Sequence, residues 1–221
     1  MKHCSPIAAI ALLLLGCQSE FDNVWRLNIR TVQWDDASLP VSDVQVILEE
    51  QRLTNGVLNA FYTEVDEGVS DVNGKLILAT ERGNVLSIRL HVMKDGCFDE
   101  FVLFNPETLV TGEDGNDVDV AIMPACEVEA TVSHVNNPCL DDNMIYRWIP
   151  RNPLNNGEDA RWDCGKEWKA VAPGSSANES CRIVGDAWLA YQLVWSCGGA
   201  DSTVLDSAWC PAGGSLVLDL D

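Results

Sequence analysis

The feature that most constrains the fold of this chain is an alternation of apolar and polar residues with a period of two. It is clearest at two places, where the apolar members are Trp25, Leu27, Ile29, Val44, Val46 and Leu48. Side chains at positions i and i+2 share one face of a β-strand, so this spacing is typical of strands with one buried face. Segments with the helical period of 3.6 are scarce. The pattern predicts an all-β chain.

Seven strand-like segments lie between residues 24 and 123, among them one in which Leu86, Ile88, Leu90 and Val92 alternate and one at Phe98–Phe104. Turn clusters separate them, among them Thr54-Asn55-Gly56, Asn73-Gly74 and Arg82-Gly83-Asn84. Short strands at this spacing predict an antiparallel β-sandwich. We expect this first domain to span residues 24–124.

The remaining residues, 125–221, show a poorer alternation. Candidate strands still cover residues 126–132, 189–195 and 216–220, and the segment Pro150–Asp163 reads as a long loop because it is rich in Asn, Pro and Gly. We expect a second sandwich of immunoglobulin-like architecture here.

The first sixteen residues predict an export signal. Lys2 and His3 supply a basic start, and residues 7–15 form an unbroken apolar run. Such a run covers about half of a bilayer core, which needs roughly 20 helical residues, so it is too short to span a membrane.

The leader ends in the tetrapeptide Leu14-Leu15-Gly16-Cys17, which resembles the lipobox of bacterial lipoproteins. The resemblance implies that residues 1–16 are removed, that Cys17 carries lipid, and that residues 17–23 form a short tether. Gln18 stands where an Asp would retain a lipoprotein at the inner membrane, which favours the outer membrane. An ordinary secretory leader that contains Cys17 by chance is the alternative.

Two segments of the first domain carry a second resemblance. Leu39–Val46 and Ser70–Leu76 are similar to the pattern of carboxypeptidase-regulatory-like, or transthyretin-like, β-sandwich domains. In that family a Pro-Val start introduces a strand with alternating valines, and a Thr/Ser-Asp-x-x-Gly turn leads into the next strand. The chain departs from this pattern in the long acidic insert Glu49–Glu67. The resemblance implies an accessory, folding-support or adhesion module without catalytic residues.

Seven cysteines remain once Cys4 leaves with the leader and Cys17 is lipidated, and six of them follow residue 125. No two are spaced as C-x-x-C, so a structural zinc site is not expected. An exported chain is expected to form disulfides instead. The pairs we expect are Cys164 with Cys181, Cys197 with Cys210, and Cys97 with Cys126, which would leave Cys139 unpaired.

Six of the eight tryptophans also belong to the second half of the chain. Trp148 and Trp162 lie near the long loop, so they are candidates for a ligand or partner surface as well as for the core. Trp188, Trp195 and Trp209 are expected in the core, since a small domain benefits from large apolar side chains.

The charge of the chain excludes some partners. Its 34 acidic and 14 basic residues give a formal net charge of −20, whereas nucleic-acid binding rests on clustered Lys and Arg. Cationic ligands, divalent metals or simple solubility remain as reasons for the acidity. The acidic turn at residues 113–119 offers oxygen ligands for Ca²⁺ but lacks the spacing of a calcium loop, so a solvated turn is favoured and no metal or cofactor is predicted.

No nucleophile elbow, nucleotide-binding glycine loop or zinc helix is present in the sequence. We therefore expect a non-enzymatic envelope lipoprotein, held to the membrane by its lipid anchor, that binds a partner protein or a surface glycan. A structural or assembly accessory protein is the alternative, and a carbohydrate-active enzyme is less favoured.

Overall fold

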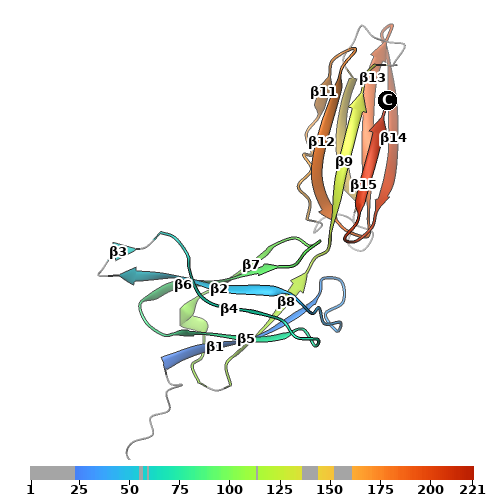
Figure 1. The fold of residues 1–221 in the computed structure, drawn as a ribbon. Coiled ribbons are helices and arrows are strands. Elements are labelled where there is room, and N and C mark those ends of the chain that lie inside the picture. Colours follow the sequence, from blue (N-terminus) through green and yellow to red (C-terminus); the bar gives the residue numbers. More distant parts are fainter. Residues whose placement is uncertain (1–22, 55–56, 59, 113, 136–143, 152–160) are drawn as a thin grey trace, which may run out of the picture. The chain divides into compact units, whose positions relative to one another are not determined.

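The computed structural model describes the chain at residues 23–54, 57–58, 60–112, 114–135, 144–151 and 161–221. It shows an all-β chain, as predicted (Figure 1). The chain divides into two compact units near Ala121 and Ile122, and the short segments Gln33–Asp35 and Met93–Asp99 belong to the second. We call these the N-terminal and C-terminal units. The predicted leader, Cys17 and most of the tether lie outside the described residues, as does Cys139.

The N-terminal unit is a β-sandwich of two sheets. Its strands are β1 (Val24–Gln33), β2 (Gln45–Thr54), β3 (Val57–Leu58), β4 (Thr63–Val69), β5 (Lys75–Glu81), β6 (Val85–Met93), β7 (Glu100–Phe104) and β8 (Asn116–Ile122). One sheet has the order β5-β1-β8 and the other β3-β2-β6-β7, with β4 also paired to β2. A short 3-10 helix, Pro106–Thr108, follows β7.

Strand β1 shows how the alternation builds the core of this unit. Trp25, Leu27 and Ile29 are 4%, 1% and 2% exposed. Val46 and Leu48 of β2 are fully buried as well. Burying such side chains contributes about 1.5–3 kcal/mol each. The strand faces predicted for β1 and β2 are thereby confirmed.

The predicted turn between β4 and β5 forms as its residues suggest. Gly74 has a φ of 71°, a conformation that glycine adopts without steric cost. The carboxylate of Asp71 accepts 2.8 Å hydrogen bonds from the backbone N–H groups of Asn73 and Lys75. These two bonds lower the pKa of Asp71. The turn thus closes against its own side chain.

Two predicted strand details differ in the structure. Val85 takes the inward position at the start of β6, so Leu86, which was expected to share the buried face, is 48% exposed. The strand expected at residues 98–104 begins only at Glu100. Phe98 is buried but lies before that strand, in a segment that belongs to the C-terminal unit.

The C-terminal unit is a second sandwich. Its strands are β9 (Ala125–Ser133), β10 (Met144–Arg151), β11 (Lys169–Val171), β12 (Ser176–Val184), β13 (Ala187–Cys197), β14 (Ala200–Cys210) and β15 (Ser215–Leu220). One sheet has the order β11-β10-β13-β14 and the other β12-β9-β15. Strands β9 and β15 are parallel, whereas the other pairs in this unit are antiparallel.

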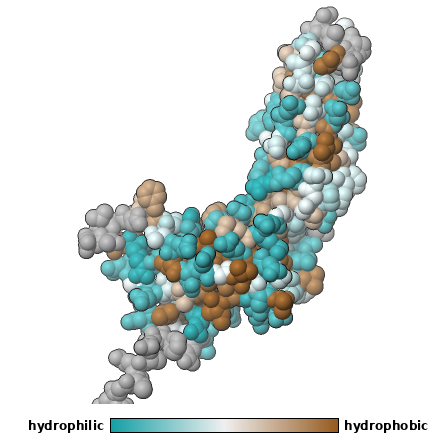
Figure 2. All heavy atoms as spheres, viewed as in Figure 1, coloured by the Kyte–Doolittle hydropathy of each residue, from teal (hydrophilic) through white to brown (hydrophobic). Residues whose placement is uncertain are grey.

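Side chains from both sheets of the C-terminal unit form one core. Val128 and Val132 on β9 pack with Tyr146 on β10 and Leu189 on β13, and all are at most 2% exposed. The surface is mixed: in Figure 2 apolar residues lie among polar ones on both units.

No helix among the described residues is long and apolar enough to cross a membrane.

Candidate functional site

Trp148, one of the two predicted ligand residues, lies in the core of the C-terminal unit. It is 1% exposed, because the even-numbered residues of β10 face the opposite sheet; Met144 and Tyr146 share this face. The indole Nε1 donates a 2.5 Å hydrogen bond to Glu179 Oε2. The prediction that Trp148 forms a ligand surface is therefore wrong.

Glu179 on β12 is a partly buried carboxylate that accepts hydrogen bonds from this core. In addition to Trp148, the Tyr146 hydroxyl and the Lys169 ammonium donate hydrogen bonds of 2.5 Å to its Oε1. Burial raises the pKa of Glu179, but the bonds from Lys169, Tyr146 and Trp148 outweigh it and hold this pKa below its usual value. Burial and the neighbouring carboxylate raise the pKa of Tyr146. The carboxylate is ionised at neutral pH and serves the packing of the two sheets.

Trp162, the other predicted ligand residue, is half-buried beside β12. Its backbone forms an isolated bridge with Ile183, and its side chain packs against the core. The Lys166 ammonium lies 5.0 Å from the centroid of its ring. The ring therefore presents only part of its surface, and a ligand role for Trp162 stays a prediction.

Trp188 and Trp209 lie on the solvent side of the β11-β10-β13-β14 sheet. They are opposite each other on β13 and β14, are 45% and 42% exposed, and meet edge to face with ring centroids 5.5 Å apart. Leu189 and Leu193 are buried, so the odd-numbered residues of β13 face the core at these positions. Successive side chains of a strand alternate between its two faces, and the even-numbered Trp188 therefore points outward. The prediction of a core position for this pair is wrong. Trp195, an odd-numbered residue, packs against the core as predicted.

Four further residues continue this surface. The guanidinium of Arg147 lies 4.6 Å from the ring centroid of Trp168, which is 44% exposed. Arg147 Nε donates a 3.0 Å hydrogen bond to Gln192 Oε1. Leu205 stands opposite Gln192 in the β13–β14 register and is 59% exposed. We call the following set the outer tryptophan face: Arg147, Trp168, Trp188, Gln192, Leu205 and Trp209.

The outer tryptophan face is open and extends across one sheet, from Trp168, directly before β11, to β14, with neighbouring strands about 4.8 Å apart. Ala190 lies between the rows of Gln192 and Trp188 and is small, so the larger side chains stand on either side of it. Indole rings offer wide apolar surfaces, while Arg147 and Gln192 offer hydrogen-bonding groups. The arrangement suits the binding of a flat, amphipathic ligand.

The exposed positions of Trp188 and Trp209 follow from the alternation of residues along the strand, which the expectation of a core position, based on side-chain size, did not take into account. The predicted buried face of residues 189–195 is odd-numbered, so Trp188 must lie on the other face. A two-residue turn at Gly198-Gly199 then places Trp209 opposite Trp188. No comparable signal marks Trp168, because its exposure depends on how β11 pairs with β10.

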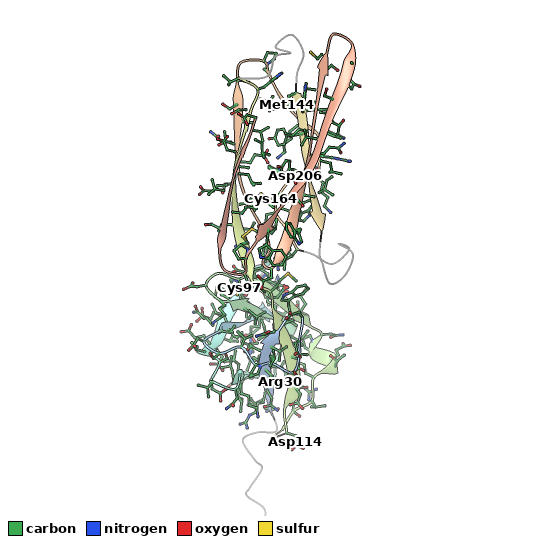
Figure 3. All side chains as sticks on the ribbon, turned by 90° about the vertical axis from the view of Figure 1, so that its right-hand side faces the viewer. Arg30, Cys97, Asp114, Met144, Cys164 and Asp206 are labelled. Carbon is green, nitrogen blue, oxygen red and sulfur yellow. A yellow bond between two sulfur atoms is a disulfide. The ribbon has the colours of Figure 1, made fainter. Side chains whose placement is uncertain are left out.

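The N-terminal unit has a groove of about 550 Å³ on the β5-β1-β8 sheet. Four of its polar side chains form two pairs: Arg30 makes a bidentate ion pair with Asp119, and Asn28 Nδ2 donates to Asp117 Oδ1 at 3.1 Å. The hydrogen bond and charge of Asp119 raise the pKa of Arg30. Arg30 and Asp114 are labelled in Figure 3. The arginine of this groove is thus already paired with a carboxylate.

Some oxygen atoms of the acidic turn at residues 113–119, considered above as calcium ligands, therefore already accept hydrogen bonds from this chain. The backbone oxygen of Asp114 accepts a 2.8 Å hydrogen bond from Asn28. Among the described residues no group of three His, Cys, Asp or Glu side chains could hold a metal ion.

His134 is fully buried, and within the described chain neither of its ring nitrogens has a hydrogen-bond partner.

A second exposed cluster lies on the other sheet of the N-terminal unit. The Arg89 guanidinium lies 3.9 Å from the Tyr62 ring centroid and 4.9 Å from that of Phe101. His91 stacks on Phe101 at 4.4 Å. Glu49 accepts two hydrogen bonds from Arg89. Because its cation is already paired, this cluster is less open to a ligand than the outer tryptophan face.

Two disulfides between described residues join parts of the C-terminal unit. Cys164 bonds Cys181, as predicted, and Cys164 is labelled in Figure 3. Cys126 bonds Cys210 rather than Cys97. Both Cys126 and Cys210 are fully buried, so the bond connects the two sheets inside the core.

The expected Cys197–Cys210 pair is wrong because the two residues lie at opposite ends of a long hairpin. Cys197 stands opposite Ala200 and Cys210 opposite Ala187. At about 3.3 Å per residue, that separation is on the order of 33 Å. Cys197 is disulfide-bonded nonetheless.

Cys97 is a free thiol, so its expected bond with Cys126 is wrong. Cys97 forms a backbone bridge with Pro124, two residues before Cys126, while Cys126 faces the core. Burial raises the pKa of the Cys97 thiol.

Comparison with known proteins gives no family. No protein-family model matches the chain, and no curated protein matches it. The resemblances to the lipobox and to transthyretin-like domains therefore stay predictions.

Some solved structures are similar at low identity. The Bacillus anthracis TIE protein is 12% identical with a TM-score of 0.35; the match covers 90% of this chain but only 34% of that protein. The shaft pilin SpaA from Lactobacillus rhamnosus GG is 10% identical with a TM-score of 0.33, covering 90% and 98% of the two chains. The minor pilin GBS52 from Streptococcus agalactiae is 11% identical with a TM-score of 0.28, covering 89% and 94%.

Proposed function

We propose that this chain is an exported, non-enzymatic envelope lipoprotein whose C-terminal unit binds a surface glycan through the outer tryptophan face. The observation that carries the proposal is the exposed cross-strand pair Trp188–Trp209 on the same sheet face as Trp168. A cluster of large apolar side chains on a soluble surface marks a binding site more often than chance exposure does.

The chemistry of the face favours a sugar. The C–H face of a pyranose ring is apolar and stacks on an indole, while its hydroxyl groups need donors and acceptors at the rim. A guanidinium has five N–H groups, and Arg147 uses one of them for Gln192. The hydrogen bond and the stacking on Trp168 hold Arg147 in place, which lowers the entropy lost when a ligand binds.

Export is supported by the disulfides. Cys126–Cys210 and Cys164–Cys181 belong to one unit, and structural disulfides persist in oxidising compartments. Lipid on Cys17 would hold the protein at the membrane, most simply at the outer membrane. Mass analysis of the mature N-terminus tests the anchor: we expect acyl chains on Cys17 and none after Cys17→Ser, and an unmodified wild-type N-terminus would contradict it.

The binding proposal is tested on a glycan array with the mature chain. We expect at least one glycan to bind, and Trp188→Ala or Trp209→Ala to weaken it tenfold or more, which corresponds to about 1.4 kcal/mol. Phe61→Ala is the matched control, because Phe61 is 79% exposed in the N-terminal unit. Absence of any bound glycan, or full binding by both tryptophan variants, would refute the proposal.

The same assay addresses the enzyme alternative. A bound oligosaccharide that is recovered intact after long incubation agrees with a binding role. Its cleavage by the wild-type chain would overturn the non-enzymatic proposal.

A further inference from the structure

Strand β14 is an edge strand of the C-terminal unit, and β13 is its one described partner. We call its other, unpaired side the rim. Strand β14 is the last strand in the order β11-β10-β13-β14 (Figure 1). All eleven of its residues pair with β13 in an unbroken register from Cys210 to Ala200. Natural edge strands are usually protected by charged side chains, above all Lys, by Pro, by a bulge or by short length. This strand is long and has no Lys, no Pro and no bulge, and its charged residues are Asp201 and Asp206.

The hairpin turn determines which backbone groups face the rim. Gly198 and Gly199 form a two-residue loop with φ of 59° and 85°, so Cys197 and Ala200 close it as a hydrogen-bonded pair. Because hydrogen-bonded and non-hydrogen-bonded pairs alternate along an antiparallel ladder, the odd-numbered residues of β14 direct N–H and C=O away from β13. Ser207 agrees with this, since its N–H donates to the Asp206 carboxylate at 2.8 Å.

The side chains at this rim would give an added strand something to pack on. Leu205 and Trp209 are 59% and 42% exposed on the outer side, and Val204 is 38% exposed on the other. A strand placed beside β14 would cover all three while pairing with the free backbone groups. Main-chain bonds then supply affinity, and alternate side chains supply specificity.

The charge of the rim indicates what kind of strand would bind. No Lys, Arg or His follows Arg182 in the sequence, whereas Asp186, Asp201, Asp206, Asp219 and Asp221 do. Strands β13, β14 and β15 therefore carry no positive side chain. Asp206, labelled in Figure 3, projects from the middle of β14. A second copy of β14 would bring its own Asp201 and Asp206 to the same rim, where like charges repel.

We propose that the β14 edge binds an extended, basic segment of a partner protein as an added β-strand. The carbonyl groups of that segment accept from the odd-numbered N–H groups of β14, and its Lys or Arg side chains pair with Asp201 and Asp206. Ser207 then bonds the added strand, which frees Asp206 Oδ1 for a cation, while Asp206 Oδ2 keeps its 3.3 Å hydrogen bond from the Tyr191 hydroxyl. This site does not depend on glycan binding at Trp188.

The probe is a synthetic peptide of about nine residues in which Lys and Val alternate, long enough for a typical strand. It is titrated into the mature chain by calorimetry, with two comparison peptides: one with Glu in place of Lys, and one N-methylated at alternate residues. We expect binding of the Lys peptide, weakened by salt, and at least tenfold weaker binding of both comparison peptides. Equal binding of either comparison peptide would overturn the proposal.

Two variants of the protein locate the site on β14. Leu205→Pro removes one N–H that faces the rim without removing a bond to β13, and Leu205→Lys adds a repelling charge. Val72→Lys is the control, because Val72 is 83% exposed in the N-terminal unit. We expect both Leu205 variants to lose the peptide tenfold or more, and Val72→Lys to keep it.

The two Leu205 variants also separate the alternatives. If Leu205→Pro proves unfolded by circular dichroism, Leu205→Lys alone decides, since an exposed Lys is tolerated in a strand rim. Full binding by a folded Leu205→Lys would overturn the proposal. Concentration-dependent dimers of the wild-type chain that Leu205→Lys abolishes would overturn it too, in favour of a second copy at this edge.

Discussion

Glu179 shows how one residue can decide whether a pattern of aromatic side chains becomes a surface or a core. Three donors, two from β10 and Lys169 from β11, converge on its carboxylate. A buried indole or phenol needs a hydrogen-bond partner. Glu179 provides it for both Trp148 and Tyr146, so these polar-tipped rings can lie between the sheets. The carboxylate also neutralises Lys169.

We expect Glu179→Gln to lower the free energy of unfolding by about 2–4 kcal/mol, because it leaves Lys169 without its anion and removes acceptors from buried donors. Urea unfolding at neutral pH measures the change. Glu127→Gln is the control at an exposed position, where a change within about 0.5 kcal/mol is expected. Equal effects of the two substitutions would contradict the role given to Glu179.

The same substitution has a predictable pH dependence. The pKa of Glu179 in the folded chain lies below its usual value of 4.5. Its contribution to stability is therefore complete above that usual value and is lost as the pH falls through the lower folded pKa. The difference between wild type and Glu179→Gln should shrink in strong acid, and a difference that grows there would contradict the assignment.

At the scale of elements, two features explain most of the correct predictions. They are the chemistry of the turns and the alternation of inward and outward residues along each strand, which we call strand parity. The Asn73-Gly74 turn forms with the positive φ that its sequence suggests. Strand parity places the alternating apolar residues of β1, β2, β9 and β13 inside. The same parity puts Trp188 outside, and a judgement based on side-chain size alone put it in the core.

Two glycines with positive φ provide a matched test of turn geometry. A Cβ on Gly74 would collide with the backbone oxygen of Thr31, whereas one on Gly198 would meet nothing within 4 Å. We expect Gly198→Ala to cost about 1 kcal/mol for the left-handed conformation alone, and Gly74→Ala about 2–4 kcal/mol because crowding is added. Thermal unfolding measures both. Similar costs for the two would show that the contact with Thr31 is relieved by small shifts.

At the scale of the whole molecule, the described disulfides belong to one of the two units. On the loop-entropy model, the Cys126–Cys210 bond, with a sequence separation of 84, contributes about 4.5 kcal/mol. The Cys164–Cys181 bond, with a separation of 17, contributes about 3 kcal/mol. The two units are thus stabilised by different means.

We expect reduction with dithiothreitol to destabilise the C-terminal unit selectively. Hydrogen exchange followed by mass spectrometry should show faster exchange in β9, β10 and β13, while β1 and β5 change little. A Cys97→Ser variant is the control and should behave as the wild type, since Cys97 is a free thiol. Equal acceleration in both units would show that they unfold together.

The candidate site could be predicted only in part. An aromatic ligand surface in the second half of the chain was expected, but at Trp148 and Trp162. Whether a tryptophan lies in the core or on the surface depends on whether its indole N–H finds a hydrogen-bond partner between the sheets. Trp148 finds Glu179 only because β10 and β12 face each other. Glu179 is far from Trp148 in sequence, so no local pattern connects them.

The sequence by itself determined the all-β class, the inward faces of the main strands and the turns, because all of these depend on residues close together in the chain. Only the tertiary structure decided that Cys126 bonds Cys210 and that Trp148 lies in the core. Cys126 and Cys210 meet because two sheets pack face to face, and Trp148 finds its hydrogen-bond partner in Glu179 on the opposite sheet. Such contacts join residues distant in sequence, and the spacing of residues along the chain does not encode them directly.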